Sequence, residues 1–268
     1  MPYKKYLCVF ADKRLKLTLK RFEKQAKDSN FYDGIYLYSE DNLEKRFYKH
    51  FKDKFKLRGF GYWAWKPQII LQTFEKINDG DILQYTDAGC HLTGNGMDRL
   101  REYFETAGKS ETGLLGFNMP QYTEKEWTKG DLFDYFGVRD REDIFEGQYV
   151  SGIIFAKKCD VGIEIVKKWL QVFYDDFSLV DDSPSKSPNF VEFKENRHDQ
   201  SVWSLLAKIN GVPCFSHSEQ LDPGVYPIYA ARDKCFKGTM VKKLCRRILP
   251  QPVFNILKNI YRRMKNST

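Results

Sequence analysis

The chain contains 268 residues, 42% of them hydrophobic, and has a formal net charge of +8 at pH 7. This length can bury a substantial core without disulfide bonds, and six scattered cysteines without a Cys-x-x-Cys pair argue against a zinc site and indicate a reducing compartment. No apolar run approaches the roughly 20 residues of a membrane span, and the N-terminus lacks the apolar core of a secretory signal, so we expect a cytoplasmic protein.

Strand and helix patterns alternate along the first part of the chain. Short apolar runs at residues 6–10 and 34–39 predict strands, and apolar positions at helical spacing predict a helix over residues 13–27 between them. Such alternation is typical of a parallel sheet with crossover helices. Further strands are predicted at residues 81–85 and 113–117, and further helices at residues 43–55, 67–77 (with Pro67 as first residue) and 97–106.

The second part of the chain is less regular. The charged and aromatic segment 121–147 has no clean period, so we expect an excursion over the functional site. Residues 148–156 predict a strand in which Gly152 marks a bulge or a close backbone approach. Amphipathic helices are predicted at residues 161–177 and 199–209.

The positive charge is a property of the C-terminal end. From Arg232 onward there are eleven Lys or Arg and one acidic residue, against 33 basic and 35 acidic residues before it. We therefore predict a folded domain over residues 1–231 and a basic amphipathic helical tail over residues 232–268.

Two tail segments, residues 241–249 and 253–264, each carry an apolar face and a basic face. Such helices can lie on an anionic bilayer, so we expect a peripheral protein on the inner face of the cell membrane. The alternative is that they pack on the domain with a solvated basic face. Nucleic acid is not expected as a partner, because the domain is slightly acidic and has no basic aromatic platform.

Asp87 follows the strand predicted at residues 81–85 and therefore lies at its carboxyl end. In open α/β sheets ligands bind beyond this edge, because helices cover both faces. Ala88 and Gly89 come next, and small residues let a ligand approach the backbone closely. The alternative role for Asp87 is to cap the following turn.

The sequence Tyr-Thr-Asp-Ala-Gly-Cys at residues 85–90 resembles the strand and acidic motif of GT-A class glycosyltransferases. Gly-Tyr-Trp-Ala-Trp-Lys-Pro at 61–67, Gln-Tyr-Val-Ser-Gly at 148–152 and Arg-His-Asp-Gln-Ser at 197–201 follow in the order expected from that resemblance. Together, over about residues 6–221, they look like bacterial glycosyltransferases that build capsular and lipopolysaccharide chains. The resemblance implies a GT-A-like, Rossmann-like α/β fold, with a mainly parallel sheet flanked by helices.

The activity implied by this resemblance is transfer of a hexose from a nucleotide diphosphate sugar, in particular a UDP-sugar. The acceptor would be a saccharide or a lipid-linked saccharide in surface polysaccharide synthesis. The class uses an Asp-x-Asp pair to hold Mn²⁺ or Mg²⁺, which neutralises the diphosphate as it leaves. Here Gly89 stands at the second Asp position, so Asp87 and His198 are the candidate metal ligands, and Arg58 and Lys66 are candidates to replace part of the metal's role.

Asp199 and Asp87 are the candidate catalytic residues. Asp199 is expected either to be a general base for the acceptor hydroxyl or simply a favourable carboxylate at a helix N-terminus. The aromatic residues at 62–65 are expected to stack on the base or a sugar ring, or alternatively to anchor their loop in the core. The predicted substrate contacts are Asp12, Arg58, Tyr62, Trp63, Trp65, Lys66, Thr86, Gly89, Gln148, Ser151, Gly152 and Gln200.

Two other functions stay open at this point. The replacement of the second Asp by Gly89 is compatible with a catalytically inactive GT-A-like protein that binds a saccharide or a partner. A nucleic-acid binder acting through the basic tail is the other alternative, and the composition of the domain argues against it.

Overall fold

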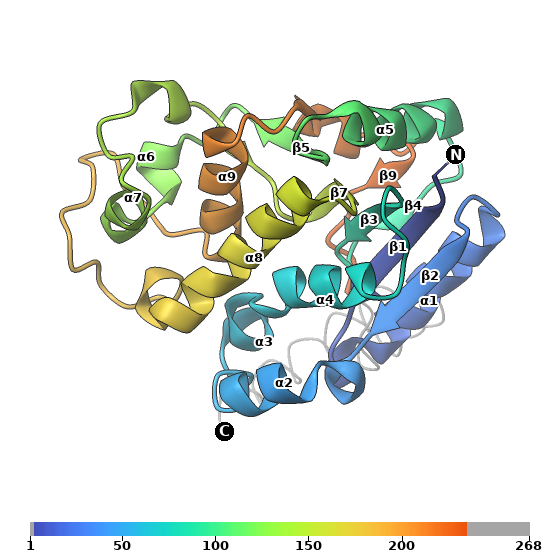
Figure 1. The fold of residues 1–268 in the computed structure, drawn as a ribbon, viewed down its shortest axis with the longest axis horizontal. Helices are drawn as coiled ribbons and strands as arrows, with labels where there is room; N and C mark the ends of the chain where they lie inside the picture. The colour runs from blue at the N-terminus through green and yellow to red at the C-terminus, as the bar shows by residue number, and fades with distance from the viewer. Residues whose placement is uncertain (1–2, 235–268) are drawn as a thin grey trace, which may run out of the picture.

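The computed structural model describes residues 3–234 of the chain (Figure 1). The described residues form a seven-stranded sheet with the order β2-β1-β3-β7-β5-β6, in which β8 also pairs with β5, and a small sheet of β4 and β9. The tail helices predicted beyond residue 234 lie outside the described residues. The strands are β1 (Lys5–Phe10), β2 (Gly34–Tyr38), β3 (Ile82–Thr86), β4 (His91–Leu92), β5 (Leu114–Met119), β6 (Gln148–Tyr149), β7 (Ile153–Lys157), β8 (Cys214–Ser216) and β9 (Ile228–Tyr229).

The large sheet is mainly parallel, as predicted. β1 pairs in parallel with both β2 and β3, and β5 pairs in parallel with β8. β7 runs antiparallel between β3 and β5, so these two neighbours point the same way. As a result, β7 begins at the sheet edge where β3 ends, because Ile153 pairs with Thr86.

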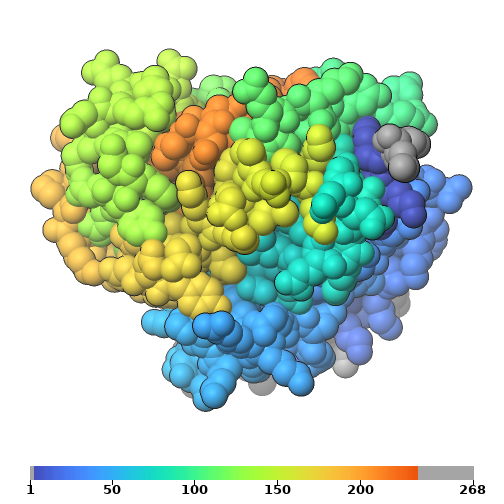
Figure 2. All heavy atoms as spheres, viewed as in Figure 1, coloured from blue at the N-terminus to red at the C-terminus, as the bar shows by residue number. Residues whose placement is uncertain are grey.

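Helices cover both faces of this sheet. α1 and α5 share one hydrophobic core with the sheet, while α2, α4, α8 and α9 share the other. Figure 2 shows α4 and α8 packed side by side over the second face. The longer helices are α1 (Lys16–Asp28), α2 (Lys45–Phe51), α4 (Trp65–Phe74), α5 (Met97–Lys109), α7 (Gly130–Phe136), α8 (Asp160–Asp175) and α9 (Asp199–Ile209).

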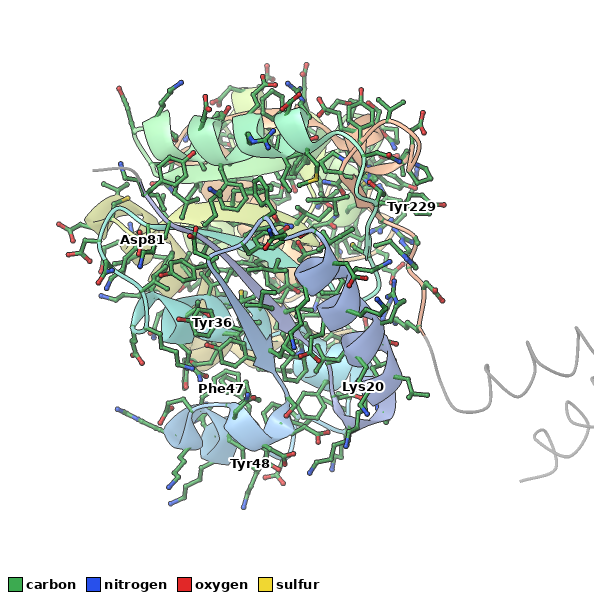
Figure 3. The ribbon with its side chains drawn as sticks, turned by 90° about the vertical axis from the view of Figure 1, so that its right-hand side faces the viewer. Lys20, Tyr36, Phe47, Tyr48, Asp81 and Tyr229 are labelled. Atoms are coloured by element: carbon green, nitrogen blue, oxygen red, sulfur yellow. The ribbon has the colours of Figure 1, made fainter. Side chains whose placement is uncertain are left out.

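The amphipathic patterns account for how these helices pack. On α2, Phe47 is fully buried and Tyr48 is exposed, and Figure 3 shows the two side chains at the base of the molecule. On α8 and α9, Trp169 and Trp203 are both fully buried, and their rings lie 5.4 Å apart. Aromatic pairs of this kind add roughly 0.5–1.5 kcal/mol beyond the burial of their area. Within residues 3–234 no helix is long and apolar enough to cross a membrane.

The segment 121–156 contains more elements than the sequence predicted. The strand predicted at residues 148–156 is divided into β6 and β7 by a bulge, because its register on β5 changes between Phe155, which pairs with Leu115, and Tyr149, which pairs with Asn118. The close approach expected at Gly152 is present, since a Cβ there would lie 3.2 Å from Asp87 Oδ2. The segment 121–147, which has no clean period and was expected as an excursion over the site, contains α6 (Glu124–Trp127) and α7. The buried Glu124 carboxylate anchors this segment, because it accepts hydrogen bonds from the Thr128 hydroxyl and from the Gln148 side-chain amide.

The aromatic and glycine loop before α4 is a left-handed turn. The segment labelled α3 (Arg58–Tyr62) has φ of 62° at Gly59, 56° at Phe60 and 82° at Gly61. The positive φ values continue at Tyr62 and Trp63. A non-glycine residue in this region costs on the order of 1–2 kcal/mol. Strain of this size is stored where the surroundings impose it, which is common at functional sites.

Substituting Gly59 by Ala tests how tightly this turn is built. A Cβ at Gly59 would lie 2.5 Å from Trp63 Cδ2, whereas a Cβ at Gly80, which also has positive φ, meets nothing within 4 Å. We expect Gly80→Ala to cost about 1 kcal/mol and Gly59→Ala about 2–4 kcal/mol of unfolding free energy, measured by urea denaturation. Equal losses of unfolding free energy in the two variants would show that the contact between the added Cβ and Trp63 does not reduce stability.

Candidate active site

A cleft of about 770 Å³ lies at the edge of the sheet where β1 and β3 end and β7 begins. Its walls come from the loops that follow β1 and β3, the left-handed turn, the loop before β7 and the start of α9. The antiparallel β7 explains why distant parts of the sequence meet here. The two halves of the site expected from the sequence, around Asp87 and around residues 197–200, therefore line one cleft.

Lys66 is the centre of the polar groups at the base of this cleft. Its ammonium lies 2.8 Å from Asp199 Oδ2 and 3.4 Å from Asp87 Oδ1. The Ser151 hydroxyl accepts a hydrogen bond from Lys66 at 3.0 Å and donates one to Asp199 at 2.7 Å. Lys66, Ser151 and Asp199 are each 3% exposed, while the Asp87 side chain is 39% exposed. Asp87 is thus the member of this cluster that faces the open space.

The charges in this cluster depend on one another. Burial by itself would lower the pKa of Lys66, but Asp199 and Asp87 offset this and leave the pKa of Lys66 raised. Burial raises the pKa of Asp199, and the ion pair with Lys66 and the hydrogen bond from Ser151 oppose that rise. Lys66 therefore remains a cation at neutral pH. Its ion pair with Asp199 favours the ionised form of that buried carboxyl group.

The residues around Asp87 do not fit the divalent cation implied by the sequence resemblance. The Lys66 ammonium stands 3.4 Å from the Asp87 carboxylate and cannot move away, because it is 3% exposed and also held by Asp199 and Ser151, so a second positive charge at Asp87 would be repelled. Asp87 also accepts a hydrogen bond from the Tyr85 hydroxyl. The other predicted ligand, His198, groups with different carboxylates, as described below. The predicted pair of metal ligands is thus divided between two places.

Gly89 lies against the backbone segment that follows β9. The segment after β9 crosses this position, with the Asp233 backbone N–H donating to the Gly89 carbonyl at 2.9 Å. A Cβ at Gly89 would be in ordinary van der Waals contact with the Arg232 Cα, at 3.4 Å, so packing alone does not require glycine here. The same segment brings Arg232 and Lys234 into the cleft wall. The sequence prediction missed these two cations, since the change in composition at Arg232 assigned them to the tail.

His198 belongs to a second polar cluster in the wall. Atoms of Asp182, Glu195 and His198 that could bind a metal lie within 4.8 Å of one another. Arg58 contacts both carboxylates, at 2.9 Å from Glu195 and 3.6 Å from Asp182. Burial lowers the pKa of His198, which favours the neutral ring. Sequence analysis missed Asp182 and Glu195, which lie in a loop without periodic pattern.

The aromatic residues of the left-handed turn have separate roles. Trp63 lines the cleft and stacks on His198 at 5.7 Å. Trp65 is 5% exposed, stacks on Phe10 and donates from Nε1 to the Gly59 carbonyl, so it mainly anchors the turn. Burial and the hydrogen bond to Asp182 raise the pKa of Tyr62 to about 12, so this hydroxyl remains a donor.

Most predicted substrate contacts line the cleft, and three do not. Tyr62, Thr86 and Gln148 are buried in its supporting walls. Thr86 points away because side chains alternate along a strand and Asp87 takes the side that faces the cleft. Gln148 is held by hydrogen bonds to Glu124 and Thr128. The predicted contacts that do line the cleft are Asp12, Arg58, Trp63, Trp65, Lys66, Gly89, Ser151, Gly152 and Gln200.

Asp12 is at the cleft but is already engaged. Its carboxylate is 5% exposed, accepts from the Arg14 backbone N–H and pairs with the Arg14 guanidinium. It caps the short turn Lys13–Leu15 that leads into α1. A contact from Asp12 to a nucleotide remains a prediction.

No protein family model matches the sequence, and no curated protein matches it. Similar solved structures are glycosyltransferases, the class that the sequence motifs resemble. Mouse xyloside xylosyltransferase 1 is 9% identical over 79% of this chain and 84% of its own, with a TM-score of 0.44. The galactosyltransferase LgtC, in complex with donor and acceptor sugar analogs, is 12% identical over 80% and 74%, with a TM-score of 0.44. A glycosyltransferase involved in glycosylation of the major capsid of PBCV-1 is 12% identical over 85% and 92%, with a TM-score of 0.39.

Proposed function

We propose that this protein is a glycosyltransferase that moves a hexose from a nucleotide diphosphate sugar to a saccharide. The observation that carries the proposal is the cleft itself. It sets an accessible carboxylate, Asp87, beside the buried cation Lys66, with further cations in its walls. A sugar nucleotide presents the matching groups: a diphosphate for the cations and a sugar with hydroxyls for the carboxylate. The other cations that line the cleft are Arg14, Arg58, Arg197, Arg232 and Lys234.

In this proposal the cations stabilise the diphosphate as it leaves. The bond from the anomeric carbon to the diphosphate breaks, a bond from the acceptor oxygen to that carbon forms, and the acceptor hydroxyl gives its proton to a base. Negative charge grows on the departing phosphate oxygen. Fixed positive charge in a sheltered cleft lowers the energy of that transition state. Asp87 orients a sugar hydroxyl, and Asp199 holds Lys66 and Ser151 in place. A general-base role for Asp199 would require it to exchange its Ser151 hydrogen bond for one from the acceptor, because Asp199 is 3% exposed.

We further propose that the acceptor is a lipid-linked saccharide in surface polysaccharide synthesis and that the donor is a UDP-sugar. The motifs that resemble capsular and lipopolysaccharide glycosyltransferases and the basic composition beyond Arg232 support this. In this proposal the tail holds the protein on the inner face of the cell membrane. A liposome flotation assay tests the membrane part: the full chain should float with anionic vesicles and not with neutral ones.

A panel of sugar nucleotides tests the transfer activity. Release of nucleoside diphosphate is measured for each donor, with and without Mn²⁺ and with a mixture of saccharide acceptors. We expect turnover with one donor class, in particular UDP-hexoses. No binding and no turnover with any donor would overturn the proposal.

The second candidate is an inactive relative that binds a sugar nucleotide or saccharide without transfer. The position of Lys66 between the two carboxylates favours it, because that geometry is also a stable structural ion pair. Calorimetry distinguishes the two functions: donor binding without product, and without response to metal, favours the inactive protein.

A further inference from the structure

Asp182, Glu195 and His198 form a cluster that the proposed transfer does not use. It lies where the cleft adjoins a second hollow of about 460 Å³, because Glu195 lines both. Asp182 lines the second hollow, and His198 lines the cleft. An imidazole and two carboxylates from three points of one loop thus face one another between two open spaces.

The His198 ring is oriented as a metal-binding imidazole is. Its Nδ1 lies 2.7 Å from the Val180 carbonyl oxygen, which can only accept, so Nδ1 carries the hydrogen. In the neutral ring Nε2 then carries the lone pair, and it faces away from Val180. Among the described residues this buried nitrogen has no hydrogen-bond partner, and it lies 3.5 Å from Asp182 Oδ1. A lone pair that faces a carboxylate oxygen is unfavourable unless a proton or a metal ion stands between them.

The surroundings fix this ring in place. His198 is 3% exposed, with the ring of Trp63 stacked at 5.7 Å and the ring of Tyr62 at 4.8 Å. Its backbone has φ of 57° and ψ of −121°, a conformation that costs on the order of 1–3 kcal/mol for a residue with a side chain. A hydrogen bond from the second ring nitrogen to a backbone carbonyl also accompanies most metal-binding histidines.

We propose that Asp182, Glu195 and His198 bind one divalent first-row transition metal ion, Mn²⁺ or Zn²⁺. One imidazole nitrogen with carboxylate oxygens suits these ions better than Mg²⁺, which prefers oxygen ligands throughout. The Arg58 guanidinium now neutralises both carboxylates, at 2.9 Å and 3.6 Å. Arg58 and the ion therefore compete for the same oxygens. Unlike the buried Lys66, the Arg58 side chain is 51% exposed, so ion binding can release its guanidinium into solvent. The proposed site shares no residue with the Lys66 cluster.

Calorimetric titration of the chelator-treated full chain with MnCl₂, ZnCl₂ and MgCl₂ tests the site. We expect one ion of Mn²⁺ or Zn²⁺ per chain, bound more tightly than Mg²⁺. Glu195→Gln should weaken binding by about 10–100-fold. Glu192→Gln is the matched control, because Glu192 is an exposed carboxylate of the same loop, and it should leave the affinity unchanged.

Arg58→Gln gives a result of opposite sign. Removing the competing guanidinium should tighten Mn²⁺ binding several-fold, an effect that a purely structural ion pair would not produce. Circular dichroism verifies that each variant is folded. In the same titrations, a lack of Mn²⁺ and Zn²⁺ binding to the unsubstituted chain would overturn the proposed site. Binding lost in Asp87→Asn but kept in Glu195→Gln also overturns it, since the ion would then be at Asp87. Neither outcome measures glycosyl transfer, so the proposed function would be judged separately by the donor panel.

Discussion

Replacing Asp87 by Asn is expected to lower kcat for glycosyl transfer by at least about 100-fold without unfolding the protein. Asp87 is the partly exposed carboxylate of the Lys66 cluster, with 39% of its side chain accessible, so it can reach a bound sugar. Asparagine keeps the shape but removes the charge opposite Lys66. Because Lys66 retains Asp199 as its partner at 2.8 Å, the unfolding free energy should change by less than about 1 kcal/mol.

Asp79→Asn is the matched control for this measurement. Asp79 precedes the same strand, but its side chain is 89% exposed and pairs with Lys158 at the surface. Initial rates with the preferred donor should be unchanged in Asp79→Asn. Full activity in Asp87→Asn would remove Asp87 from the reaction and favour a structural role for its ion pair.

Replacing Lys66 by Met is expected to cost about 3–5 kcal/mol of unfolding free energy at neutral pH. Methionine fills similar space, but it leaves Asp199 buried without its cation. Burial already raises the pKa of Asp199, and loss of Lys66 removes the main opposing influence. The folded variant then binds a proton more tightly than the unfolded chain. Its stability should therefore fall as pH rises from about 4 through the raised pKa.

Urea denaturation at pH 5 and pH 7.5 measures both effects. Lys20→Met is the control, because Lys20 is an exposed lysine on α1 (Figure 3). The double variant Lys66→Met with Asp199→Asn should recover much of the loss, since it buries no unpaired charge. A loss in Lys66→Met no larger than that in Lys20→Met would mean that Asp199 does not depend on the ion pair.

Local patterns in the sequence predicted much of this fold. The helix at residues 199–209 coincides with α9, because its apolar spacing is clean and Asp199 is a favourable first-turn residue. The strand before Asp87 and its position at the sheet edge are also confirmed. The strand predicted across residues 148–156 is interrupted at the bulge expected near Gly152, between β6 and β7.

The wall residues were harder to predict because tertiary contacts alone place them. Arg232 reaches the cleft through backbone pairing beside Gly89, and Glu195 lies in a loop with no period. Thr86 was expected at the site from its neighbours in sequence, but strand alternation turns it away. Spacing in the sequence indicates which residues share an element, and it does not indicate which loops cross.

The Lys66 cluster also bears on how the protein folds. Along the chain, 85 residues separate Lys66 from Ser151, and another 48 separate Ser151 from Asp199. Closing such long loops is slow, so contacts of this range form late. Until Asp199 arrives, Lys66 has no buried partner and cannot be desolvated at low cost. During synthesis the cleft can therefore close only after α9 has left the ribosome, which makes substrate binding one of the last properties that the chain acquires.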